Sequence, residues 1–349
     1  MMPKKRISRA SALVGIALTA SLALGACASE DSPTGEGSAA SFEAERVTWL
    51  IPVPPGASFD TFARAVAPHV GDELGADILV ENRPGASGLV ALNEMAASDP
   101  DGSTIALWQM GPIAISQLQG VEELRFDLED LSYIGNFADA DHMLFVSDDS
   151  EIDTVSDLQP GFAFASGELG SLGYTSQQIL DDVLDLDAEF ITGYDDQGQR
   201  LDAIERGDAD GVIGPVRTYE SIGRLDDVRP ILRLANQRHS DFPDVPTALE
   251  LEGLDEDERA VIETQFNMAS LFFTIVGPEN MSDGVLEEMR AAFWTVANDE
   301  EVLTELAATG LDLEPEEEYK SGEELEEFIP TLLDVPEDYQ ILLDEIAQK

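Results

Sequence analysis

The loop Pro54 to Ser58 has the residue types to bind an anion through its backbone. It follows a short apolar run, Val47 to Val53, that indicates a buried strand, and it precedes a segment with helical spacing of apolar residues. The first N–H groups of a helix have no intrahelical acceptor, so this geometry can hold a carboxylate or a phosphate. Any strand–helix connection contains such a turn. Binding and simple connection therefore both remain open.

Two polar residues at this helix start have defined expectations. Ser58 is a favourable N-cap, and Asp60 places negative charge in the first helical turn. Asp60 has two open roles, which are contact with a ligand through water and stabilisation of its own helix.

The sequence shows no catalytic constellation. It has no Walker loop, no nucleophile elbow and no zinc-protease helix. The glycines of residues 167–173 have the spacing G-x-x-G-x-x-G, which fails the dinucleotide fingerprint. Carboxylate pairs occur at 195–196 and 208–210, without the surrounding pattern of a calcium loop. The three histidines lie on separate segments without ligand spacing: His69, His142 and His239. We therefore predict neither an enzyme nor a bound cofactor or metal.

The elements around the first loop alternate between strand and helix. A second strand at Asp77 to Val80 leads into a small-residue loop, and a helix at Leu89 to Ala97 follows, with Ser87 as its expected cap. A strong turn then precedes a third strand at Thr104 to Trp108. This order predicts a parallel sheet with helices on both faces.

The N-terminus reads as a targeting segment. Four cations precede the apolar run Ala10 to Leu24, which is too short to span a membrane. Leu24 to Cys27 resembles a bacterial lipobox, so residues 1–27 are expected to be a lipoprotein signal with Cys27 lipidated, and residues 28–44 a flexible tether. The alternative is an ordinary signal peptide. Cys27 is the only cysteine, so no intramolecular disulfide is possible.

The net charge of −52 limits which classes of partner the protein can bind. It excludes nucleic acid as a partner, because proteins bind nucleic acid by neutralising its phosphates with cations. It also predicts a salt-adapted protein, since the self-repulsion of so many carboxylates must be screened. A merely acidic surface is the alternative.

Three segments carry a family resemblance: PPGASFDTFAR (54–64), LVENRPGASG (79–88) and SDPDGSTIAL (98–107). In this order they resemble the extracytoplasmic solute receptors of tripartite tricarboxylate transporters, also called Bug receptors. Further on, the strand and Ser-Gly loop at 162–167 and the segment 242–247 are similar to the same family. Three residues depart from its pattern: Ala57 replaces a glycine, Ser103 a tyrosine and Asp195 a lysine.

The resemblance implies an α/β fold of the two-lobed periplasmic-binding-protein type (type II, Venus flytrap). Each lobe would be a mainly parallel sheet flanked by helices. Lobe 1 would comprise residues 45–143 and, with the C-terminal helices, 231–349, and lobe 2 residues 144–230.

The same resemblance places a ligand at the carboxyl ends of the strands, between the lobes. Backbone dipoles and hydrogen bonds, rather than an arginine clamp, would hold it. Arg83 is the best candidate for a local cation, although pairing with an acidic neighbour explains it better. The expected substrate-binding residues are Gly56, Ala57, Ser58, Phe59, Asp60, Gly85, Ala86, Met110, Ser166, Gly167, Ser171, Leu172 and Tyr194.

The expected function is that of a monomeric receptor, lipid-anchored at the outer face of the cell membrane. It would capture a small organic anion, such as a di- or tricarboxylate, and deliver it to integral-membrane transporter subunits. The alternative is a sensor that presents its ligand-bound form to a signalling partner. An enzyme on the same fold is disfavoured by the missing constellation.

Overall fold

The computed structural model describes residues 41–139, 141–167, 171–194, 196–311, 313 and 319–347. All of them belong to one compact unit, Ala39–Lys349. The expected signal with Cys27, and the unusual Asp195, lie outside the described residues. In the described part of the chain, no helix is long and apolar enough to cross a membrane.

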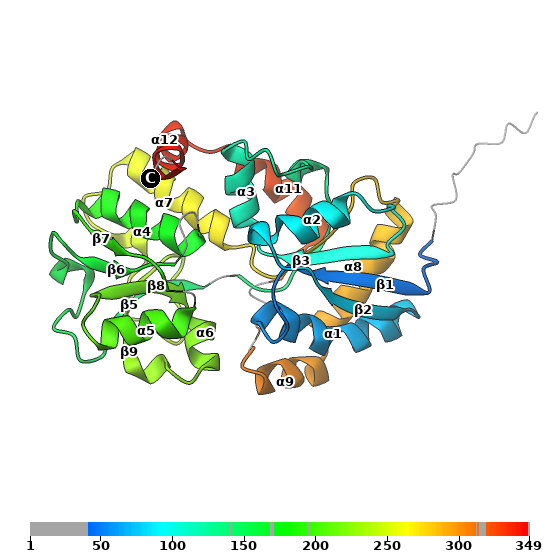
Figure 1. The fold of residues 1–349 in the computed structure, drawn as a ribbon, viewed down its shortest axis with the longest axis horizontal. Coiled ribbons are helices and arrows are strands. Elements are labelled where there is room, and N and C mark those ends of the chain that lie inside the picture. The colour runs from blue at the N-terminus through cyan, green and yellow to red at the C-terminus, as the bar shows by residue number, and fades with distance from the viewer. Residues whose placement is uncertain are drawn as a thin grey trace, which may run out of the picture. The chain divides into compact units, whose positions relative to one another are not determined.

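The first sheet has six strands in the order β11–β4–β10–β3–β1–β2. Figure 1 shows β3, β1 and β2 side by side. β1 to β4 run in one direction, while β10 and β11 run antiparallel to them. The strands are β1 (Arg46–Ile51), β2 (Asp77–Asn82), β3 (Thr104–Trp108), β4 (Ser132–Asn136), β10 (Thr274–Gly277) and β11 (Lys320–Ser321). We call this sheet and its helices the first lobe.

Helices cover the first sheet because their apolar stripes face it. In α1, Phe62, Val66 and Val70 are buried, and α1 packs against β2 and α8. α8 and α11 also pack on β4. The helices of this lobe are α1 (Ser58–Leu74), α2 (Leu89–Ala96), α3 (Gly111–Leu118), α8 (Asp283–Ala297), α9 (Glu300–Ala308) and α11 (Gly322–Leu333).

The second sheet has five strands in the order β7–β6–β8–β5–β9, of which only β5 runs antiparallel to its neighbours. Its strands are β5 (His142–Ser147), β6 (Ala163–Ala165), β7 (Glu189–Ile191), β8 (Gly211–Pro215) and β9 (Val228–Arg233), and its helices are α4 (Leu172–Leu184), α5 (Gln197–Glu205) and α6 (Val216–Ser221). We call this the second lobe. The expected lobe boundaries after residues 143 and 230 fall inside β5 and β9.

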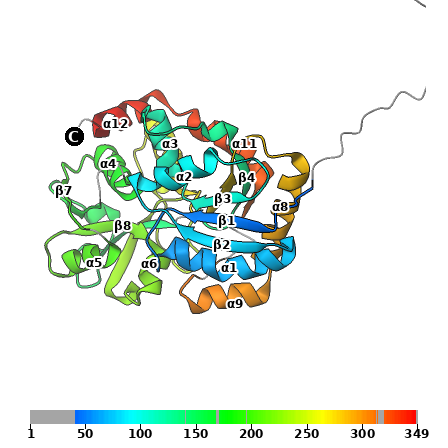
Figure 2. The same cartoon turned by 45° about the vertical axis from the view of Figure 1, so that its right-hand side comes forward.

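Two helices connect the lobes. α7 (Glu256–Ala269), labelled in Figure 1, packs against α3 of the first lobe and α4 of the second, and α12 (Glu337–Ala347) packs against α4 and α7. Figure 2 shows α12 above α4. The buried Gln265 of α7 donates to Ser176 Oγ at 2.9 Å and accepts from Tyr339 Oη at 2.7 Å. One continuous hydrophobic core therefore includes residues of both sheets.

Short 3-10 turns complete the chain. They are Ala86–Gly88, Leu128–Asp130, Val155–Asp157, Leu225–Asp227 and Ala248–Glu250.

The structure corrects both helix-cap predictions. α1 has Ala57 as its N-cap with no side-chain cap bond, and Ser58 is its first helical residue. α2 is preceded by Gly88, while Ser87 adopts a left-handed conformation with φ 51°. At α1, Asp60 reaches back from inside the first turn and accepts the N–H of Gly56, which precedes the helix, so no side chain caps the first N–H groups of α1.

Candidate functional site

Asp60 organises the loop after β1. Its carboxylate accepts the N–H of Gly56 at 2.8 Å, Arg64 Nε at 2.9 Å and Asn82 Nδ2 at 2.9 Å, and the residue is only 3% exposed. Burial opposes ionisation, but the hydrogen bonds from Arg64, Gly56 and Asn82 outweigh it and lower the pKa of this carboxyl. Of the two roles left open by the sequence, the structure shows the stabilising one.

The hydrogen bonds of Asp60 determine which backbone N–H groups of this loop remain available to a ligand. The Gly56 N–H is already occupied, and Ala57 N–H points to Pro54 O at 3.4 Å. The N–H groups of Ser58 and Phe59 begin α1 and have no acceptor within the helix. They are the donors in this loop that fit an anion.

The second loop takes an unusual backbone path. Gly85, Ala86, Ser87 and Gly88 all have positive φ, at 138°, 47°, 51° and 99°. A Cβ added at Gly88 would lie 2.6 Å from Trp108 Nε1, so glycine is required by both conformation and space. Gly85 and Ala86, both exposed, thus form a fixed turn beyond β2.

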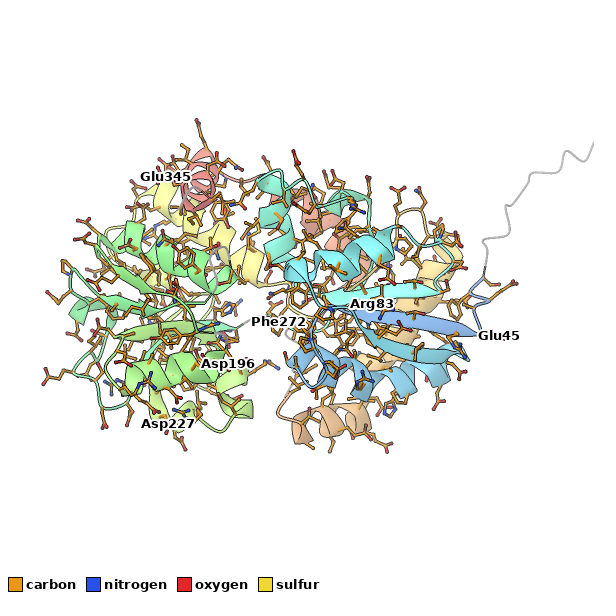
Figure 3. All side chains as sticks on the ribbon, in the orientation of Figure 1. Glu45, Arg83, Asp196, Asp227, Phe272 and Glu345 are labelled. Carbon is orange, nitrogen blue, oxygen red and sulfur yellow. The ribbon has the colours of Figure 1, made fainter. Side chains whose placement is uncertain are left out.

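Arg83 is occupied by its acidic neighbours. Arg83, which is labelled in Figure 3, bonds to Glu81, and its Nε lies 3.3 Å from Glu94. The interpretation of Arg83 as one member of an ion pair is confirmed, and the guanidinium is not left free for a ligand.

An aromatic group lies at the same sheet edge. The Phe59 ring is 4.7 Å from the ring of Trp108 and 4.9 Å from that of Phe272, which is labelled in Figure 3. Trp108 ends β3, and Phe272 lies two residues before the start of β10, which runs antiparallel to β3. The sequence analysis missed Trp108 and Phe272, although an aromatic residue at a strand's carboxyl end was a readable signal for Trp108. Met110, by contrast, is fully buried, so its side chain belongs to the core.

The second sheet brings Ser166, Gly167 and Ser171 to its carboxyl edge, after β6. Ser171 is the N-cap of α4 and accepts the Tyr174 N–H at 3.3 Å. Ser166 is fully buried and donates to Gln177 Oε1 at 2.5 Å, so it holds the loop in place from inside. Leu172 is likewise buried, whereas Tyr194 is half-buried.

Arg200 is a residue of this edge that the sequence analysis missed. It lies in the first turn of α5, and a Cβ built on Gly167 would be 2.8 Å from its Nη2. Its Nε is buried and, within the described residues, has no hydrogen-bond partner. The available signal was a cation five positions after Asp195, where the family resemblance places a lysine.

A cavity of about 670 Å³ lies elsewhere and contains none of the predicted site residues. It is lined by residues 139 and 141, by residues 216, 217 and 220 of α6, by residues 233–241, and by residues 266, 267, 269 and 270. There Asp141 accepts from Arg233 Nε at 2.8 Å and lies 2.9 Å from His239 Nε2. Because these groups are paired with one another, we take the two sheet edges, not this cavity, as the candidate ligand site.

The described residues contain no group of three or more His, Cys, Asp or Glu side chains that could hold a metal ion. The carboxyl edges of the two sheets present backbone N–H groups, small residues and one arginine. Such groups can bind an anion.

Both sheets are mixed rather than mainly parallel, because antiparallel strands are inserted in each of them. Two such sheets joined by crossing segments, each with a helix start at its carboxyl edge, define a two-lobed solute-binding protein. The comparisons then give the family. The profile of the tripartite tricarboxylate transporter family receptor matches residues 62–329, and the chain belongs to this family. Its members are receptors, not enzymes.

Curated relatives are distant. Protein BugT of Bordetella pertussis is 28% identical over 223 residues, which covers 61% of this chain and 68% of that protein. A protein encoded in the tcbD–tcbE intergenic region of Pseudomonas sp. is 25% identical over 220 residues, covering 61% of this chain and 65% of the relative, slightly under two thirds.

Solved structures share the fold. A solute-binding protein from Polaromonas, without ligand, gives a TM-score of 0.67 at 17% identity, covering 86% of this chain and 98% of that one. MatC from Rhodopseudomonas palustris, with bound malate, gives a TM-score of 0.62 at 20% identity. The match covers 85% of this chain and 99% of MatC. A further R. palustris protein, with adipate, gives a TM-score of 0.63 at 18% identity. The match covers 86% of this chain and 97% of that one.

Proposed function

We propose that this protein is an extracytoplasmic receptor that binds a small organic acid between its lobes and delivers it to a membrane transporter. The observation that carries the proposal is the pair of open helix starts, α1 and α4, at the carboxyl edges of the two sheets. Malate and adipate in two solved structures of the same fold support a carboxylate as the ligand class.

The proposed contacts follow from what remains available in each lobe. In the first lobe, the N–H groups of Ser58 and Phe59 hold one polar end of the ligand, and the turn Gly85–Ala86 closes the side. In the second lobe, Gly167, Ser171 and Tyr194 form the opposite wall. Asp60, Met110, Ser166 and Leu172 support these loops from the interior, since they are buried.

We further propose that a lipid on Cys27 anchors a monomeric receptor to the outer face of the cell membrane. The lipobox-like junction supports this. Cys27→Ser should move the protein from the membrane fraction to the soluble fraction, and mass spectrometry of the wild-type N-terminal peptide should show the acyl groups. A wild-type peptide with unmodified Cys27 would refute the anchor and leave the binding function untouched.

The binding test is calorimetric titration of the signal-free chain carrying Cys27→Ser, in molar salt. The panel consists of malate, adipate, a tricarboxylate, an acidic amino acid and an aromatic acid. A dissociation constant in the micromolar range, corresponding to about −8 kcal/mol, is expected for one class. The proposal would be refuted if no member of the panel bound to a protein that circular dichroism shows to be folded and mass spectrometry shows to be free of retained ligand.

A further inference from the structure

Arg200 lies against the glycine of the Ser-Gly loop. A Cβ on Gly167 would be 2.8 Å from Arg200 Nη2, 3.1 Å from its Cζ and 3.4 Å from Ser171 Oγ. The guanidinium therefore covers the Gly167 backbone, beside the N-cap of α4. A side chain at position 167 would displace it, which gives this glycine a reason other than backbone conformation.

The charge of Arg200 is not neutralised within the part of the chain that the structure describes. The protein has 71 acidic residues against 19 lysines and arginines, yet no carboxylate of the described residues forms an ion pair with Arg200. Its acidic neighbour Asp196 is engaged as the cap of α5, accepting from Gln199 N at 2.8 Å and Gln199 Nε2 at 3.2 Å. Three exposed arginines also form no ion pair with a described residue, but water can solvate them: Arg46, Arg125 and Arg259.

The other described groups near Arg200 supply no negative charge. Tyr219 is fully buried and donates its hydroxyl to Gln197 Oε1 at 3.0 Å. His142 is buried at the start of β5, and burial lowers its pKa to about 4, so it is neutral at physiological pH. Burial also lowers the pKa of Arg200, which reflects incomplete solvation of its charge. A cation that is partly removed from water is normally paired, and no described residue supplies a counterion for this half-buried arginine.

We propose that Arg200 binds a carboxylate group of the ligand at the amino end of α4. The guanidinium presents a planar fork that matches a carboxylate through two parallel hydrogen bonds. Ser171 and the start of α4 add dipoles of the same sign. The inference rests on the proposed receptor function and names the residue that selects an organic acid over a neutral solute.

Arg200→Met tests this, because methionine keeps an unbranched side chain and removes the charge. Titration with malate and adipate should show affinity at least about 100-fold weaker than in the wild type, as expected for the loss of a bidentate charged contact. Arg200→Lys keeps the positive charge but lacks the planar guanidinium, so its affinity should lie between those of the wild type and Arg200→Met. Arg206→Met is the matched control, since Arg206 ends the same helix and forms only an exposed pair with Asp208 at 2.8 Å. It should bind like the wild type.

A urea titration without ligand accompanies the binding data. Arg200→Met should unfold at a denaturant concentration no lower than the wild type, because no native partner is lost. Binding by Arg200→Met within about threefold of the wild type would overturn the role of Arg200 and leave the receptor function standing. A clearly lower unfolding midpoint would overturn it as well, because it would reveal a structural role. A folded wild type that binds no member of the full carboxylate panel would refute the receptor function itself.

Discussion

Replacement of Asp60 by alanine should destabilise the protein by about 3 kcal/mol. The variant loses acceptor contacts from Gly56, Arg64 and Asn82, and hydrogen bonds to a charged group contribute about 1.5–3 kcal/mol each. The Arg64 contact counts for little, because that side chain is 49% exposed. Asn82 keeps its bond to Val53 O at 2.9 Å, and water can reach the freed Gly56 N–H. The expected loss of stability is therefore well below the sum of three full hydrogen bonds to a charged group.

Urea unfolding in molar salt measures this loss, and Ser58→Ala is the matched control. A serine that caps a helix contributes about 1 kcal/mol. Ser58 makes no cap bond here, so its replacement should cost less than about 0.5 kcal/mol. The reasoning is wrong if Asp60→Ala costs under about 1 kcal/mol, or if Ser58→Ala costs as much as Asp60→Ala.

Four further outcomes follow. Gly111→Ala should unfold or lose more than about 3 kcal/mol in thermal melts, because its Cβ would lie 2.0 Å from Met268 O; a mild effect would contradict the tight α3–α7 packing. His142 has a folded pKa of about 4 against 6.5 when unfolded, so the unfolded state binds the proton first and stability falls as pH drops from 6.5 to 4, by about 3 kcal/mol. His142→Asn should lose that part of the pH dependence in urea titrations at both ends of the range, and an unchanged slope would exclude this role. The hydrogen bond to Asp141 raises the pKa of His239, so Asp141→Asn should lower it in an NMR titration, and no change would refute the pairing. Finally, if the chain is salt-adapted, its melting temperature rises from low to molar salt, and a flat response would leave only an acidic surface.

Much of the fold could be predicted because its signals are local. The strand, small-residue loop and helix at the start of the chain, together with the family motifs, identified a two-lobed receptor. The place of β10 between β3 and β4 depends on pairing across more than 130 residues. Local periodicity carries no information about such a partner.

The candidate site was harder to predict, since its decisive features are contacts between distant residues. Loop composition indicated Ser58, but the carboxylate of Asp60 proved able to reach the loop and hold Gly56. The role of Arg200 depends on α5 folding back over Gly167, which no spacing rule describes. The motif residues thus mark the loops at which we propose the site, while the side-chain contacts there are fixed by tertiary structure.

The central position of β10 has a consequence for how the chain is made. β3 and β4 do not pair with each other, because β10 lies between them. A ribosome has therefore synthesised all of the second lobe before residues 274–277 can complete the first sheet. Until then the apolar edges of β3 and β4 have no partner, and such edges are prone to aggregate. We expect the nascent chain to need a holding chaperone up to that point, with the second lobe, whose strands are continuous in sequence, able to form first.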